Sequence, residues 1–204
     1  APGGGFQALH AGTLPTQPPR RVPRASDLFG FKAHFRATRL AEGLMPLLAF
    51  EGGYGGLVHV DDGLVSLSCC IRRDKLDEVR AGGTAEAGEA VLAHIESSCR
   101  GVREALAGAT RDGAWLAAGP IRPGVRPTST RGAFPVGNAA GEAHPVVAEG
   151  ISMAIQGAGL LASRLDAWRA AGGSRSALAA VGTGYARDWR RAFAPRIAAS
   201  AAVA

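Results

Sequence analysis

The sequence predicts an α+β fold, with an antiparallel sheet flanked by helices and a mainly helical C-terminal part. Apolar and polar residues alternate in the first half, two strand-like runs are joined by turn residues, and apolar residues recur every three or four positions after residue 150. A chain of 204 residues can form one large domain or two small ones. We divide it into an irregular lead-in (1–26), a part with the sheet and its helices (27–125) and a C-terminal part (126–204).

Composition argues against several classes of protein. Apolar residues make up 47% of the chain, but no apolar run approaches the ~20 residues that span a bilayer. The net charge is +6, yet the arginines are scattered and do not interleave with aromatic residues, which disfavours a nucleic-acid-binding module. The cysteines have neither CxxC spacing nor a disulfide framework, which predicts reduced, structural thiols in a cytoplasmic protein. They are Cys69, Cys70 and Cys99. No metal site is predicted.

The predicted strands begin near residue 28. In "LFGFKAHF" apolar and polar residues alternate, as in a half-buried strand. The apolar residues are Phe31, Ala33 and Phe35, and the polar ones are Lys32, His34 and Arg36. "LMPLLAFEGG" is a second candidate. "GGYGGLVHV" and "LVSLSCCI" flank an Asp-Asp-Gly turn and predict a hairpin, giving an antiparallel sheet of about four strands. Later, "AWLAAGPIRPG" returns to strand and ends at proline and glycine.

Two helical segments are predicted between the hairpin and that later strand. One covers about residues 75–80. The other is capped by Thr84 and continues to about residue 107, with Val91, Ile95 and Val102 along one side.

Two longer helices are predicted near the C-terminus. The first runs from residue 150 to about 170 and is ended by Gly172 and Gly173. Its apolar side, recurring at spacings of three and four, consists of Ile151, Ile155, Ala158, Ala162 and Leu165. Ser174 can cap the final helix. The predicted buried face of that helix consists of Leu178, Val181, Tyr185 and Trp189.

The stretch "GNAAGEAHPVVAEGISMAIQGAG", residues 137–159, has the composition of a ligand site, and "GAFPVG" before it predicts a short strand. Gly137 and the alanines let another molecule approach the backbone, and the amide of Asn138 can donate and accept. Pro145 stiffens the loop. At Glu149 and Gly150 a helix begins, where unpaired N–H groups favour partial negative charge. These features suit a polyol together with an electron-rich ring edge.

This stretch resembles the second FAD fingerprint of FAD-dependent oxidoreductases of the p-hydroxybenzoate hydroxylase and geranylgeranyl reductase type. That fingerprint has Gly-Asp-Ala-Ala, a proline, and a Gly-rich helix start, which here become "VGNAAGEAHPVVAEGISMAIQGA". The resemblance implies that Gly137 and Asn138 contact the ribityl and pyrophosphate region of FAD and that Pro145 lies beside the isoalloxazine. It also implies a helix start at the flavin N1/O2 edge, where it would stabilise reduced flavin. The residues of that helix start are Glu149, Gly150 and Ile151.

The resemblance also implies an organisation. Residues 27–125 would be the substrate domain, and 126–204 the last strand and C-terminal helices of an α/β FAD-binding domain. The strand followed by Gly-x-Gly-x-x-Gly, which opens that fold, is missing from this sequence. We therefore expect the C-terminal part of a longer flavoprotein or a truncated relative, with the N-terminal half of the same fold as its partner. A less favoured alternative takes "GAGLLA" as that fingerprint, which requires a strand over residues 151–156.

The predicted function is that of an FAD-dependent oxidoreductase acting on a small molecule. Monooxygenation and double-bond reduction both remain open, with NAD(P)H or another hydride donor. Halogenation ranks lower, because no Lys-plus-Trp signature is evident. A non-catalytic remnant that has lost FAD is the alternative, and a basic nucleic-acid-binding module comes third. No catalytic residue is assigned.

Individual polar residues have competing interpretations. For His144, loop packing is favoured over catalysis. The polar set on the first strand either meets an acidic substrate or forms a solvated face, and His59 is an ordinary strand residue. Asn138 stands where the family has Asp, so the substitution Asn138→Asp is expected to be tolerated or to improve flavin binding.

Overall fold

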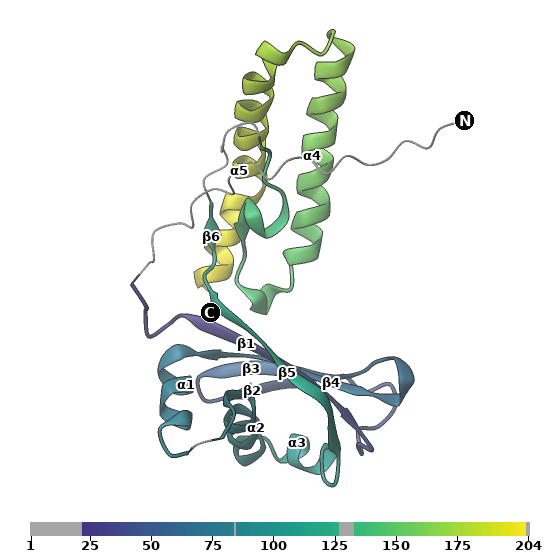
Figure 1. Ribbon diagram of the computed structural model, residues 1–204, viewed down its shortest axis with the longest axis vertical. Helices are drawn as coiled ribbons and strands as arrows, with labels where there is room; N and C mark the ends of the chain where they lie inside the picture. The colour runs from purple at the N-terminus through teal and green to yellow at the C-terminus, as the bar shows by residue number, and fades with distance from the viewer. Residues whose placement is uncertain (1–21, 84, 127–132, 203–204) are drawn as a thin grey trace, which may run out of the picture.

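The computed structural model describes residues 22–83, 85–126 and 133–202. Three helices lie on one side of a five-stranded sheet, and two long helices stand on the other side (Figure 1). The strands are β1 (Leu28–Arg36), β2 (Leu47–Phe50), β3 (Gly53–His59), β4 (Val65–Arg72) and β5 (Thr110–Ile121). The helices are α1 (Arg73–Arg80), α2 (Ala87–Ser98), α3 (Arg100–Ala105), α4 (Gly150–Ala170) and α5 (Leu178–Ala202). The predicted combination of an antiparallel sheet with helices is confirmed.

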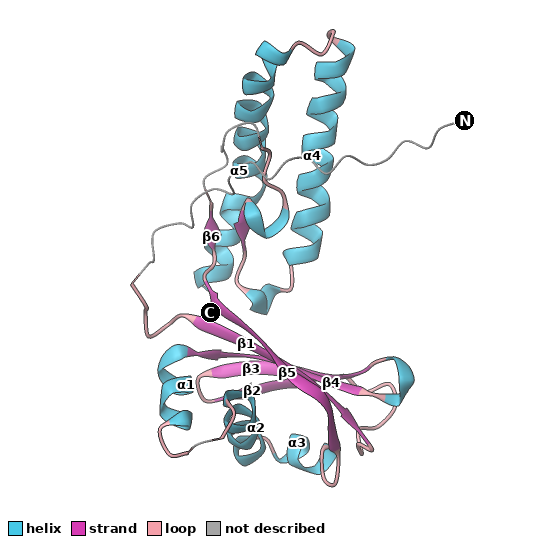
Figure 2. Ribbon diagram, in the orientation of Figure 1, coloured by secondary structure: helices cyan, strands magenta, loops and turns pink. Residues whose placement is uncertain are grey.

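The sheet has the order β2-β3-β4-β1-β5, and every neighbouring pair is antiparallel. All the strands expected from the alternating pattern are present, and the predicted hairpin is β3–β4 (Figure 2). Phe31, Ala33 and Phe35 are buried, as predicted, on the face that α1, α2 and α3 cover. The residues between them lie on the opposite face, which we call the open face of the sheet. This open face looks toward the two long helices (Figure 1).

The helices under the sheet differ from the prediction in one respect. Val91, Ile95 and Val102 are buried as expected, but the single helix expected to reach residue 107 is interrupted at Cys99, which is extended (φ −115°, ψ 95°). Ser97 and Ser98 both donate their hydroxyls to the carbonyl of His94 (2.8 and 2.9 Å). Such side-chain bonds compete with the helix ladder and weaken it at this point. Thr84, the predicted cap, lies outside the described residues, as do residues 1–21 of the lead-in.

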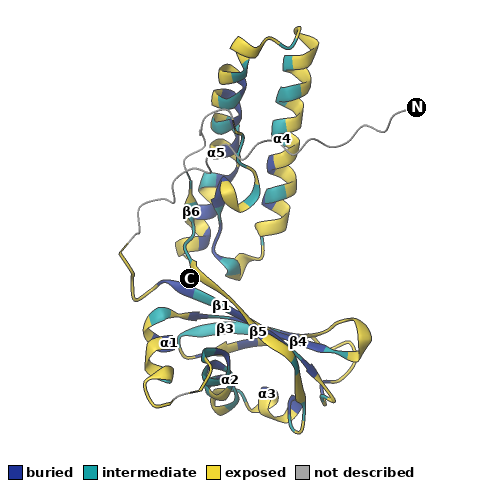
Figure 3. Cartoon of the chain, viewed as in Figure 1, coloured by how far each residue is buried: buried dark blue, intermediate teal, exposed yellow. Residues whose placement is uncertain are grey.

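The helix predicted from residue 150 to 170 is confirmed as the continuous helix α4, so the strand over 151–156 required by the "GAGLLA" alternative is wrong. The prediction of which side of α4 is buried, however, is wrong. Ile151 and Ile155 are 80% and 69% exposed, and Met153 and Gly157 are buried instead. Much of α4 is exposed (Figure 3). A Cβ at residue 157 would lie 3.1 Å from Nε1 of Trp189. The glycine therefore faces α5 and lies close to the indole of Trp189.

The second long helix, α5, buries the predicted residues Val181, Tyr185 and Trp189, while Leu178 is half-buried. Gly172 and Gly173 end α4 with positive φ values of 93° and 64°, as expected. Ser174 does not cap α5, because a short turn (Arg175–Ala177) precedes that helix and the Ser174 hydroxyl bonds that of Ser176 at 2.7 Å.

The segment before the predicted ligand loop is not the strand that "GAFPVG" predicts. Among the described residues, Ala133 forms an isolated bridge and residues 134–136 are irregular. Pro135 lacks an N–H for a strand ladder, and its carbonyl accepts the Tyr185 hydroxyl at 2.8 Å. The segment is therefore bound to α5 rather than to another strand.

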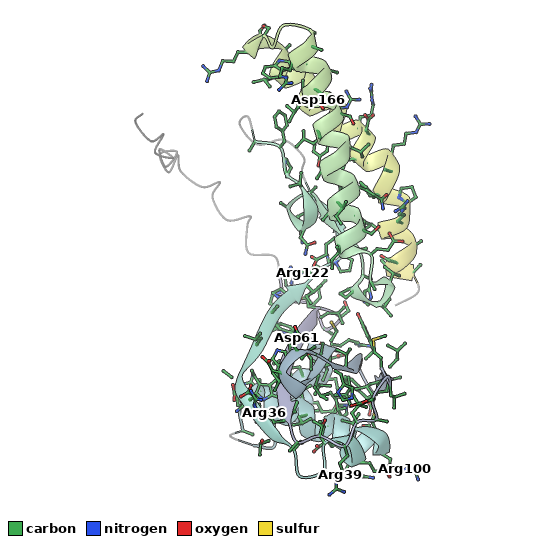
Figure 4. The ribbon with its side chains drawn as sticks, turned by 90° about the vertical axis from the view of Figure 1, so that its right-hand side faces the viewer. Arg36, Arg39, Asp61, Arg100, Arg122 and Asp166 are labelled. Atoms are coloured by element: carbon green, nitrogen blue, oxygen red, sulfur yellow. The ribbon has the colours of Figure 1, made fainter. Side chains whose placement is uncertain are left out.

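Arg122 directly follows β5 and lies at the junction between the sheet and the helices (Figure 4). It forms an ion pair with the buried Asp27, which directly precedes β1. The guanidinium of Arg122 donates to both carboxylate oxygens of Asp27, a buried residue that also accepts the N–H of Arg24 at 2.9 Å. The Arg122 guanidinium lowers the pKa of Asp27 below its usual value of 3.8. This pair fixes where the chain leaves the sheet.

We expect Asp27→Asn to lower the unfolding midpoint by roughly 5 °C at neutral pH, because it leaves a guanidinium without its counter-charge. The stabilisation from a carboxylate with a lowered pKa is present above the usual value of 3.8 and is lost as the pH falls through the lowered value. The difference in unfolding midpoint between the wild-type protein and Asp27→Asn should therefore shrink in acid. Thermal unfolding followed by circular dichroism between pH 7 and pH 2 measures it, and a difference that grows in acid would contradict the assignment.

The three cysteines are free thiols, and burial raises the pKa of Cys69 to about 12 and that of Cys70 in the same direction. Both thiols are therefore protonated at neutral pH, in agreement with a structural role. None of the described helices combines the length and apolar character needed to cross a bilayer.

Candidate functional site

Residues 137–151 form a series of tight turns between the sheet and the long helices. They comprise a turn at Gly137–Ala139, the short strand β7 (Gly141–Glu142), a second turn at Pro145–Val147, and the start of α4. Gly137 and Ala148 have positive φ values of 57° and 53°. Ala148 adopts this costly conformation where the second turn ends, one residue before Glu149. The predicted loop thus folds as two compact turns in front of a helix.

The loop is anchored on α5. A Cβ at Gly141 would lie 2.4 Å from Cη2 of Trp189, so only glycine fits between that indole and the paired strand β6 (Gly124–Val125). Ala140 and Ala143 on either side are buried in the same cluster. The backbone N–H of His144 donates to Oγ of Ser200 at 2.9 Å.

His144 holds the second turn against the sheet. Its side chain is buried, its Nδ1 accepts the N–H of Val146 at 3.3 Å, and its ring lies 6.0 Å from the ring of Tyr54 on β3. Burial lowers the pKa of His144, which keeps the imidazole neutral and its Nδ1 available as an acceptor. These contacts support the packing interpretation.

The start of α4 is open. Glu149 precedes it without a side-chain cap, and its carboxylate lies 3.5 Å from Nη1 of Arg196. A Cβ at Gly150 would meet no heavy atom within 4 Å, and Ile151 is exposed. The N–H groups of this first turn are therefore accessible, and the helix dipole favours a partial negative charge beside them.

A pocket of about 360 Å³ lies between the second turn and the open face of the sheet. From the turn, Pro145, Val146 and Ala148 line it. From the sheet and the loop before β2, its lining includes Met45, Leu47, Tyr54, Val58, Ser68 and Cys70. The walls are mainly apolar. Burial, and secondarily the neighbouring Cys70 thiol, raise the pKa of Tyr54, so its hydroxyl stays protonated and can donate.

The open face also carries polar atoms that lack partners. Among the described residues, four buried side-chain polar atoms make no hydrogen bond, and three of them belong to this face: Nδ1 of His34, the hydroxyl of Tyr54 and Oγ of Ser66. His34 and Ser66 are directly opposite each other on β1 and β4. The Tyr54 hydroxyl lies near the Cys70 thiol without the geometry of a hydrogen bond. A buried polar atom without a partner costs free energy, and a bound molecule with matching groups would remove that cost.

The other polar candidates lie outside this pocket. Lys32, His34 and Arg36 share the open face, but none lines the pocket, and Arg36 is paired with Asp112 at 3.1 Å. His59 bonds the carbonyls of Leu40 and Ala41 through Nε2 at 3.1 and 3.2 Å, which is a structural role. Within residues 22–83, 85–126 and 133–202, no group of three His, Cys, Asp or Glu side chains could hold a metal ion.

The structure brings only some of the predicted site residues together. Pro145 lines the pocket, and Glu149, Gly150 and Ile151 follow within six residues. Gly137 lies against the second turn of α4, since a Cβ there would be 3.5 Å from Cβ of Ala154. Sequence reasoning missed Tyr54 and Cys70. Their signal was the period-2 pattern of β3 and β4, in which these directly paired residues belong to the open face.

No family model matches the sequence, and no curated protein matches it significantly. Solved structures do resemble it. The flavin-dependent halogenase CmlS has a TM-score of 0.60 and 21% identity, over 84% of this chain and 30% of that protein. The myxobacterial chondrochloren halogenase CndH has a TM-score of 0.64 and 23% identity, over 83% of this chain and 39% of that protein. PqsL, a probable FAD-dependent monooxygenase from Pseudomonas aeruginosa, has a TM-score of 0.53 and 16% identity, over 89% of this chain and 46% of that protein.

At these identities the similarity concerns the fold. The chain spans between about a third and a half of the length of the structures that it resembles. The antiparallel sheet with its helices is therefore part of the fold found in FAD-dependent halogenases and monooxygenases.

Proposed function

We propose that this chain is the C-terminal part of an FAD-dependent oxidoreductase and that residues 137–151 contribute to its flavin site. One observation carries the proposal. An open helix start and a mainly apolar pocket adjoin each other at the junction between sheet and helices, in a chain with this fold.

The residues present suit a flavin. The accessible N–H groups of Gly150 and Ile151 can receive the ring edge on which negative charge develops, and Gly150 has no side chain to obstruct it. Pro145 offers an apolar surface to the ring, and Gly137 and Asn138 can approach the ribityl hydroxyls. The chemistry that FAD supplies when bound is two-electron transfer between a donor such as NAD(P)H and oxygen or a substrate double bond.

The pocket on the open face suits a small, largely apolar substrate that carries a hydrogen-bond acceptor. Its walls are apolar, and the neutral Tyr54 hydroxyl is a donor without a partner among the described residues. Such sites combine apolar contact with a few placed polar groups.

Halogenation is the second candidate reaction. CmlS and CndH, whose folds this chain partly shares, are halogenases, whereas PqsL is a probable monooxygenase. The resemblance to the p-hydroxybenzoate hydroxylase and geranylgeranyl reductase type favours oxygenation or double-bond reduction. The alternative to both is a remnant that no longer binds FAD.

We expect the 204-residue chain alone to bind FAD weakly or not at all. It lacks the Gly-x-Gly-x-x-Gly cradle, and several charge-assisted hydrogen bonds of ~1.5–3 kcal/mol each would be missing. The product of the complete reading frame should be yellow after gel filtration, and FAD titration of the two proteins measures the difference. Submicromolar binding by the 204-residue chain would contradict this prediction. A colourless product of the complete frame would favour the remnant.

A further inference from the structure

We propose that Glu142 and Arg126 are positioning residues for Asn138, and that they orient its amide so that Oδ1 is presented as a hydrogen-bond acceptor to a ligand hydroxyl. The ligand part of this inference rests on the proposed function. The orientation of the amide rests on contacts within the chain.

Three side chains form a closed network. Nη2 of Arg126 donates to Oε2 of Glu142 at 2.7 Å, and Nδ2 of Asn138 donates to Oε1 of the same carboxylate at 3.2 Å. Nε of Arg126 donates to the backbone carbonyl of Asn138 at 2.7 Å. Each residue thus contacts the other two.

The backbone holds this network in place. Gly124 pairs with Glu142 and Val125 with Gly141, and the N–H of Arg126 donates to the carbonyl of Ala140 at 2.9 Å. Because Gly141 is packed against Trp189, the network is attached to the core of the helical part.

The chemistry of Glu142 determines which end of the amide faces it. Its carboxylate can only accept hydrogen bonds, and its side chain is 19% exposed. The NH₂ group of Asn138 must therefore face Glu142, which leaves Oδ1 as the free acceptor of this exposed residue. Among the described residues Oδ1 has no hydrogen-bond partner. An acceptor held in one orientation suits a ribityl hydroxyl better than a freely rotating amide, since less ordering is required on binding.

This geometry reverses the expectation that Asp would be tolerated at position 138. The substitution Asn138→Asp would replace Nδ2, which lies 3.2 Å from Oε1 of Glu142, by a carboxylate oxygen, so that two negative charges would meet. The negative charge that the family motif carries at the second position of its fingerprint is carried here four residues later, by Glu142.

The amide orientation can be tested without any ligand. Asn138 is the only asparagine in the chain, so labelling with ¹⁵N-asparagine gives one side-chain NH₂ signal pair. We expect the signal of the hydrogen that is bonded to Glu142 to be displaced from the position of a solvated amide, and Glu142→Ala to move it back. Glu96→Ala, which removes a carboxylate on α2, is the control and should not move it. Signals that are unaffected by Glu142→Ala would overturn the proposed network.

The presentation to a ligand is tested by a reciprocal exchange in the product of the complete reading frame. We expect Asn138→Asp to weaken FAD binding roughly tenfold, a coupling of ~1.4 kcal/mol that is typical of residues in one network. Adding Glu142→Gln should restore binding, because a glutamine NH₂ can then donate to the new carboxylate. The readouts are FAD affinity and the unfolding midpoint of the flavin-free protein.

The outcomes separate the two proposals. Rescue of both affinity and midpoint supports the inference. Undiminished FAD binding by Asn138→Asp would overturn it. A wild-type protein without flavin would contradict the proposed function, while a midpoint lowered by Asn138→Asp and restored by Glu142→Gln would still support the amide orientation.

Discussion

Gly150→Val is expected to abolish flavin incorporation while the sheet and both long helices stay folded. The reason lies at the first residue of α4, where a Cβ would meet no heavy atom within 4 Å. Valine also has a better helix propensity than glycine, so the chain itself accepts the larger residue. The branched side chain would instead occupy the space in which the flavin edge must approach the helix N–H groups.

The measurement is flavin absorbance per protein after gel filtration, with circular dichroism as the folding control. Gly159→Val is the matched control, because Gly159 is an exposed position of the same helix with the same open surroundings. It should keep full flavin occupancy. Equal loss in both variants would indicate a general effect on α4, and full occupancy in Gly150→Val would place the flavin elsewhere.

Trp189→Ala is expected to have the largest effect on stability, a loss of about 3–5 kcal/mol, as for other fully buried tryptophans. Trp189 is 1% exposed, its ring centroid lies 5.1 Å from that of Phe193, and the indole fills the space left by Gly141 and Gly157. Its removal therefore creates a cavity and frees the loop that leads to the candidate site.

Urea unfolding followed by circular dichroism measures this loss, with Trp168→Ala as the control. Trp168 is half-buried and donates Nε1 to the carbonyl of Ser174 at 2.8 Å, so its removal should cost about 1 kcal/mol. Trp189→Phe should cost less than Trp189→Ala, because the phenyl ring fills part of the cavity. Neither variant loses a hydrogen bond of the indole N–H, which has no partner among the described residues. Equal losses for the two alanine variants would contradict this account of the core.

The sheet could be predicted because its residues obey a local rule. In β1 each residue is assigned to a face by alternation alone, and Phe31, Ala33 and Phe35 are buried accordingly. The orientation of α4 could not be predicted in this way. There the residue that faces α5 is Gly157, which carries no apolar side chain, so counting apolar residues selected the exposed Ile151 and Ile155 instead.

The candidate site shows the same division. The open helix start at Gly150 and the stiff turn at Pro145 could be predicted, since both follow from residues adjacent in sequence. The contact of Arg126 with Glu142 could not, because it spans 16 residues and depends on the pairing of β6 with β7. Tyr54 lines the pocket from β3, far from residues 137–151 in sequence, and its ring lies 6.0 Å from that of His144 in the loop.

The most direct test of the central claim is the position of the flavin in a crystal structure of the loaded product of the complete reading frame. We predict that the N1/O2 edge of the ring lies at a hydrogen-bonding distance of about 3 Å from the N–H groups of Gly150 and Ile151, with Pro145 beside the ring. A flavin bound without contact to residues 137–151 would contradict the assignment of this segment as part of the flavin site.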